Sequence, residues 1–97
     1  MTGLEQVYAR DPNFVSRRIE DETILVPIRN NVGDLDSIYS LNAVGAFIWE
    51  RLDGSADLGF ICDVITREYD IDAMAAETDL VTFIDQLDSI AAIRPTG

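Results

Sequence analysis

Alternating apolar and polar positions within the first 41 residues predict three short strands. The runs Phe14–Ile19 (FVSRRI) and Thr23–Ile28 (TILVPI) are rich in β-branched residues and flank the acidic turn Glu20–Glu22, a pattern typical of a hairpin. Pro27 has no backbone N–H to donate, so it should lie near the end of the pairing or at a bulge. The run Ser37–Leu41 (SIYSL) alternates in the same way and predicts the third strand.

The third strand is expected to pass directly into a helix at Asn42, whose side chain can accept a hydrogen bond from an amide of the first turn. Apolar residues then recur with helical spacing at Val44, Phe47, Ile48 and Leu52. Gly45 lowers the helix propensity, which indicates that another element approaches closely at this position. Asp53-Gly54 predicts the end of the helix, because glycine suits a left-handed cap.

Two further helices are predicted in the second half of the chain. Asp57 is expected to cap a helix over Leu58–Tyr69, and Asp72 a third helix that runs to about Ile90. Their apolar stripes are Leu58, Ile61, Cys62 and Ile65 in the second helix, and Leu80, Phe83, Ile84, Leu87, Ile90 and Ala91 in the third. The order β-β-β-α-α-α predicts an α+β fold. We expect a winged helix-turn-helix-like domain, with a three-stranded antiparallel sheet followed by three helices.

The length of 97 residues supports one domain. We divide the chain into a loose N-terminal arm (1–12), a single domain (13–93) and a C-terminal tail (94–97). No apolar run approaches the roughly 20 residues that cross a bilayer, and the N-terminus lacks the basic and apolar segments of a signal peptide. Cys62 is the single cysteine, which fits a reducing compartment. We therefore expect a cytoplasmic location.

The charge balance argues against nucleic acid and anionic membranes as partners. The net charge is −11, and all seven basic residues are arginines. The expected third helix carries Glu77, Asp79, Asp85 and Asp88 and no basic residue. Phosphates would therefore be repelled at the position where a winged-helix protein reads DNA. The acidity either keeps the chain soluble or selects a basic partner, and the sequence leaves both explanations open.

The side chains that most enzymes use for catalysis are missing. The sequence has no histidine and no lysine, which excludes the commonest general base, the commonest zinc ligand and Schiff-base chemistry. Cys62 lies on an apolar helix face and is interpreted as a small core residue. Carboxylate pairs such as Asp85 with Asp88, or Asp34 with Asp36, fit solvated surface charges better than an acid–base pair or a cation site, because no calcium-binding loop surrounds them. We expect no cofactor, no metal and no enzymatic activity.

Three segments carry short motifs in a fixed order. They are SIYSLNAVGAFIWERLDG (37–54), REYDID (67–72) and TDLVTFIDQLDS (78–89). The matching positions are Leu41-Asn42, Gly45-Ala46-x-Ile48-Trp49, Asp53-Gly54, Tyr69-Asp70, and Asp79 followed by Phe83 and Leu87. In this order and spacing they resemble the PqqD-like family, the recognition elements of pathways that modify ribosomally made peptides. The resemblance covers roughly residues 14–90.

The resemblance implies a non-catalytic adaptor that binds the leader segment of a precursor peptide. The adaptor presents this peptide to a maturation enzyme, such as a radical SAM protein, a cyclase or a leader protease. In such domains the leader adds as an extra strand to the third strand and packs against the third helix, and the free N–H and C=O groups of an edge strand pair with a backbone of any sequence. The candidate peptide-binding residues are Asp36, Ser37, Ile38, Tyr39, Ser40 and Leu41 on the strand, and Thr78, Val81, Thr82, Asp85 and Asp88 on the helix.

The roles within this candidate set differ. Tyr39 and Leu41 are expected mainly to fill the core, whereas Ile38 and Val81 either contact the peptide or pack within the domain. The alternative function is a structural or regulatory subunit that binds a partner protein through the same groove.

The charge and the C-terminal end of the candidate site give two further hypotheses. The acidic face around Asp85 and Asp88 indicates a leader, or an enzyme, with positive charge near the contact. Many relatives continue past the third helix with a polar helical segment, whereas this chain ends in AAIRPTG. This departure leaves open how the turn near Ile93 closes the groove.

Overall fold

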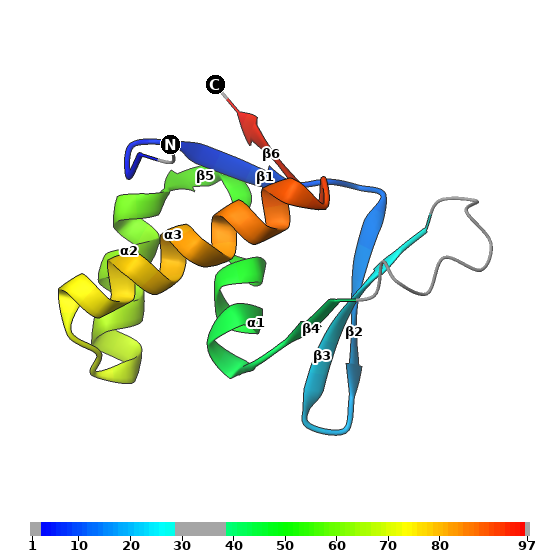
Figure 1. The fold of residues 1–97 in the computed structure, drawn as a ribbon, viewed down its shortest axis with the longest axis horizontal. Helices are drawn as coiled ribbons and strands as arrows, with labels where there is room; N and C mark the ends of the chain where they lie inside the picture. Colours follow the sequence, from blue (N-terminus) through cyan, green and yellow to red (C-terminus); the bar gives the residue numbers. More distant parts are fainter. Residues whose placement is uncertain (1–2, 29–38, 97) are drawn as a thin grey trace.

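The described part of the chain forms six short strands and three helices (Figure 1). The computed structural model describes residues 3–28 and 39–96. The elements are β1 (Val7–Arg10), β2 (Phe14–Ile19), β3 (Glu22–Pro27), β4 (Tyr39–Leu41), α1 (Ala43–Glu50), β5 (Asp53–Asp57), α2 (Leu58–Tyr69), α3 (Ala73–Ser89) and β6 (Ile93–Thr96). The strands form two antiparallel three-stranded sheets, in the orders β2-β3-β4 and β5-β1-β6. The prediction of an α+β fold is confirmed.

The β2-β3-β4 sheet follows the predicted hairpin and third strand. Ile19 pairs with Glu22 across a two-residue turn, and Glu20 in that turn has a left-handed φ of 57°. Pro27 is the last residue of β3 and pairs with Phe14 at the open end of the hairpin, as expected for a residue without an N–H. The predicted strand residues Ser37 and Ile38 lie outside the described part of the chain.

The β5-β1-β6 sheet is absent from the sequence-based prediction. Strand β1 lies in the segment expected to be a loose arm, and it pairs along its length with β6 near the other end of the chain. Strand β5 begins at Asp53, where the prediction placed only a helix end. Gly54 does have a left-handed φ of 83°, but helix α1 ends earlier, with Arg51 as a right-handed cap. The prediction of Asp53-Gly54 as the helix cap was therefore wrong.

The predicted N-caps of all three helices are confirmed. Asn42 accepts a hydrogen bond from the Gly45 amide at 2.7 Å, and Asp57 accepts one from the Phe60 amide at 2.8 Å. Asp72 accepts from two amides at the start of α3. These side chains satisfy amides that have no partner within the helix. The change from strand to helix at Asn42 therefore needs no separate turn.

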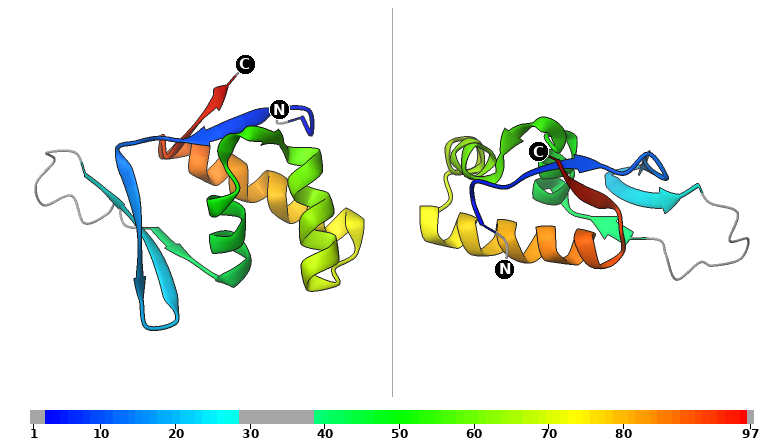
Figure 2. Two further views of the ribbon diagram at one scale, coloured as in Figure 1. Left: turned by 180° about the vertical axis from the view of Figure 1, so that it is seen from behind. Right: turned by 90° about the horizontal axis from the view of Figure 1, so that it is seen from above.

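One apolar core connects the helices with both sheets. The largest fully buried side chains are Leu25, Leu52, Leu58, Ile61, Ile65, Leu80, Ile84 and Leu87. The second sheet contributes Tyr8 from β1 and Ile93 from β6, which are 8% and 3% exposed. Figure 2 shows β1 and β6 crossing near the C-terminal end of α3, so this sheet covers one end of the helical layer. Among the described residues, no helix has both the length and the apolarity needed to cross a bilayer.

Candidate functional site

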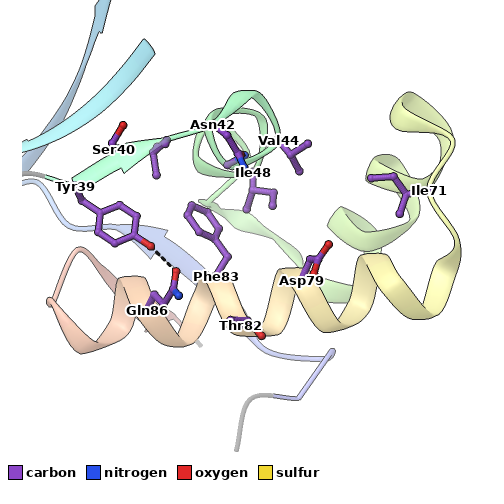
Figure 3. Close-up of a pocket in the computed structure, with 12 residues that line it drawn as sticks. Tyr39, Ser40, Asn42, Val44, Ile48, Ile71, Asp79, Thr82, Phe83 and Gln86 are labelled. Carbon is purple, nitrogen blue, oxygen red and sulfur yellow. Dashed lines mark hydrogen bonds between the residues drawn. The ribbon is translucent and has the colours of Figure 1, made fainter.

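A groove of about 390 Å³ lies between strand β4, the N-terminal half of α1 and one face of α3 (Figure 3). Its lining comes mainly from two segments that are distant in sequence and meet in the fold. The lining residues are Tyr39, Ser40, Leu41, Asn42, Val44, Gly45, Ile48, Ile71, Asp79, Thr82, Phe83 and Gln86. The groove combines an apolar floor with polar groups along its rim, the usual composition of a ligand site.

Close packing between α1 and α3 forms the floor of the groove. A Cβ atom at Gly45 would lie at an ordinary contact distance of 3.5 Å from both Leu41 Cβ and Phe83 Cε1, and more tightly, at 3.3 Å, against Asn42 Oδ1, so the Phe83 ring lies close to the backbone at the start of α1. This agrees with the close approach predicted for Gly45. Phe83 remains half-buried, and Figure 3 shows its ring pointing from α3 toward α1. Part of an aromatic face is therefore available to a ligand.

The two ends of the groove differ in polarity. At one end, the Tyr39 hydroxyl donates a hydrogen bond to Gln86 Oε1, which connects β4 to α3 across the groove (Figure 3). At the other end, Asp79 projects from α3 on the side where Val44 and Ile71 lie. Asp79 is exposed. The groove is thus neutral and bridged at one end, and acidic at the other.

Strand β4 is an edge of its sheet, and the register shows which of its backbone groups point outward. The amide of Ile28 donates to the Asn13 carbonyl at 2.7 Å, so these two residues form a hydrogen-bonded pair. Hydrogen-bonded pairs alternate along an antiparallel ladder. The Ile24–Arg17 pair is therefore also hydrogen-bonded, and the backbone polar groups of Ile24 face β2 rather than β4.

The same alternation assigns the groups of β4. Ser40 pairs with Ile24, whose polar groups are already directed to β2, so this is a non-hydrogen-bonded pair. The N–H and C=O of Ser40 consequently point to the free edge of the sheet, whereas those of Tyr39 and Leu41 point to β3. The Ser40 side chain is held separately, because its hydroxyl donates to Glu22 Oε1 at 2.7 Å. Within residues 3–28 and 39–96 these two groups have no partner in the sheet, so an incoming backbone meets one donor and one acceptor at Ser40.

The predicted site residues divide into three groups. Tyr39, Ser40, Leu41 and Thr82 line the groove. Thr78, Val81, Asp85 and Asp88 lie on α3 but do not line it. Asp36, Ser37 and Ile38 lie outside the described residues.

The predicted groove residues of α3 differ from the observed ones because the predicted face is rotated about the helix axis. The groove face of α3 consists of Asp79, Thr82, Phe83 and Gln86, whereas the predicted set began with Thr78 and followed the same spacing. A shift of one residue turns a helix face by about 100°. The other lining residues were not predicted from the sequence, although the three motif segments contain all of them; they are Asn42, Val44, Gly45, Ile48, Ile71, Asp79, Phe83 and Gln86.

The described residues contain no arrangement typical of a catalytic or metal site. No group of three or more histidine, cysteine, aspartate or glutamate side chains in residues 3–28 and 39–96 could hold a metal ion. Burial raises the pKa of the Cys62 thiol, helped by the nearby carboxylates of Glu77 and Asp63, so the thiol stays protonated. Hydrogen bonds from Ser55 lower the pKa of Asp53, which lies on the surface. Neither group lines the groove.

Comparison with known proteins supplies the family. The sequence profile of the family described as "Coenzyme PQQ synthesis protein D (PqqD)" matches residues 22–92. A solved structure of TbiB1 in complex with the TbiA(beta) leader peptide is similar in fold, with a TM-score of 0.73 and 27% sequence identity over 92% of this chain and 98% of that one. Comparison with curated proteins found no significant match. Because the family profile covers most of the sequence, the chain belongs to the PqqD family.

Proposed function

We propose that this chain is a non-catalytic adaptor that binds the leader segment of a ribosomally made precursor peptide and presents it to a modifying enzyme. The observation that carries the proposal is the free edge of β4, where the outward N–H and C=O of Ser40 lie beside the groove. Membership of the PqqD family supports it. The similarity to TbiB1, which was solved with a leader peptide, supports it further.

Binding by strand addition follows from the chemistry of this edge. The peptide backbone accepts from and donates to Ser40, which fixes its register without reading its sequence. Side chains on one face of the added strand then enter the groove and contact the exposed part of Phe83 and its apolar neighbours. Backbone pairing supplies the general affinity, and the groove supplies the selectivity.

The other features of the adaptor are part of the same proposal. The β2–β3 hairpin beside three helices is consistent with a winged helix-turn-helix-like fold, in which α3 occupies the position of a DNA-recognition helix. Helix α3 has no basic residue, which favours a peptide over DNA. The enzyme that receives the peptide is a radical SAM protein, a cyclase or a leader protease, and the lone buried Cys62 is consistent with action in the cytoplasm.

An NMR titration tests the proposal. The ¹⁵N-labelled chain is titrated with the synthetic leader half of the precursor peptide encoded beside its gene, and a scrambled peptide of the same composition is the control. We expect saturable shifts at Ser40 and at the groove face of α3, with little change at β1 and β6. The absence of shifts at millimolar peptide, or shifts away from the groove, would contradict the proposal and favour a structural or regulatory subunit.

A further inference from the structure

The charge of the groove is carried by one side chain. Among the described residues that line it, Asp79 is the single charged one. None of the arginines in the described residues contributes to the lining, namely Arg10, Arg17, Arg18, Arg51, Arg67 and Arg94. Within the part of the chain that the structure describes, no hydrogen bond or ion pair is found for the Asp79 carboxylate. A ligand in the groove therefore meets an uncompensated negative charge at a defined place.

The distance between Asp79 and the Tyr39 end of the groove follows from the geometry of α3. Gln86, which the Tyr39 hydroxyl contacts, lies at the opposite end of the groove face of α3. The two helix residues are separated by about 10 Å along the helix axis, because each residue rises about 1.5 Å. A strand covers this length in about three residues.

We infer that the groove selects leader segments with a lysine or arginine about three residues from the leader residue that lies beside Tyr39, and that Asp79 is the residue that recognises this positive charge. The inference rests on the proposed function and adds a sequence preference to it. Val44 and Ile71 lie near Asp79 in the groove, so the methylene groups of a long basic side chain have an apolar surface to cover. A peptide acid at the same place would be repelled by Asp79 and by the net charge of −11.

A selection from random peptides tests this preference without a known leader. A library of random twelve-residue peptides, displayed on their own mRNA, is selected against the immobilised chain at low salt and sequenced. The same selection is repeated with Asp79→Lys and with Asp88→Lys. The second variant makes the same change of charge on α3 outside the groove, because Asp88 is exposed and does not line it.

The expected outcome is a family of peptides with lysine or arginine at a fixed distance from a bulky apolar residue. This preference should turn to aspartate or glutamate with Asp79→Lys and persist with Asp88→Lys. For one selected peptide, replacing the basic residue by glutamine should weaken binding to the parent chain about two- to fivefold, the range of an exposed ion pair. This difference should shrink as salt shortens the screening length.

The other outcomes separate the inference from the proposed function. Enriched peptides without a charge preference, or an equal effect of Asp88→Lys, would overturn the inference and leave leader binding intact. The absence of any enriched family would overturn the proposed function and the inference together.

Discussion

Replacing Ser40 by proline removes one backbone donor from the free edge of β4. The register places the Ser40 N–H on the side away from β3, so its loss breaks no hydrogen bond within the sheet. Proline is tolerated in an edge strand where the N–H faces solvent. The substitution therefore acts on the added peptide strand rather than on the fold, provided that strand addition occurs at this edge.

The expected loss can be estimated from the bonds that disappear. One backbone hydrogen bond contributes about 1 kcal/mol net, and the peptide carbonyl that it served loses its partner at a further cost of about 1 kcal/mol. The sum of about 2 kcal/mol corresponds to a weakening of about 30-fold, since about 1.4 kcal/mol is tenfold in affinity. The matched control is Ser40→Ala, which removes the hydroxyl bond to Glu22 but keeps the N–H. Its affinity should stay within about twofold of the parent, because the hydroxyl lies on the surface.

Fluorescence anisotropy with a labelled leader peptide measures both variants, and circular dichroism checks that each is folded. A folded Ser40→Pro variant that binds within threefold of the parent would refute pairing at Ser40. A second measurement leaves the protein unchanged and methylates the peptide backbone nitrogens one at a time. Affinity should fall at every second position, because alternate residues of an added strand face the sheet edge. Uniform losses along the peptide would also argue against strand addition.

Three further predictions concern stability and reactivity. Tyr8→Ala should lower the free energy of unfolding by about 3 kcal/mol, because it leaves a cavity where an almost fully buried ring packs. Urea denaturation measures this loss, and a loss below about 1 kcal/mol would indicate that residues 1–12 are a loose arm after all. Asp70→Gly should raise the melting temperature by about 4 °C. Asp70 ends α2 with a left-handed φ of 50°, which glycine adopts without strain. An unchanged or lower melting temperature would contradict this reasoning. Burial raises the pKa of Cys62 in the folded chain, so its stabilising effect is complete below the pKa of the unfolded thiol and is lost as the pH rises above it. Ellman's reagent at pH 8 should accordingly modify the native chain at least tenfold more slowly than the chain in urea, and equal rates would contradict burial of the thiol.

Local patterns predicted the elements that depend on neighbouring residues. The hairpin, the three N-caps and the spans of α2 and α3 follow from alternation, helical spacing and capping side chains, all of which lie within a few residues of one another. Strands β1 and β6 depend on a pairing between the two ends of the chain, such as Val7 with Thr96. Their four-residue runs carry too little alternation to reveal a partner so far away in sequence. The second sheet therefore became visible only in the structure.

The face of α3 that lines the candidate site also depends on contacts between residues that are distant in sequence. The two elements that the resemblance indicated, β4 and α3, both border the groove. The choice of face on α3 required the rotation of the helix about its axis, which depends on how Leu80, Ile84 and Leu87 pack in the core. Half-buried apolar residues flank that stripe on both sides, Val81 on one and Phe83 on the other. The sequence pattern therefore allowed two faces of α3 that differ by about 100°.

The second sheet also explains how the fold can leave the edge of β4 unpaired. Helix α3 ends at Ser89, and the chain turns through Ala91, with a left-handed φ of 61°, into β6. Strand β6 then pairs with β1, and the amide of Ala92 donates back to the Leu87 carbonyl at 3.0 Å. These contacts fix the C-terminal end of α3 to the second sheet. The width of the groove is therefore set by the packing of α3 and by the β1–β6 pairing, so the edge of β4 is free to pair with a peptide without supporting the fold.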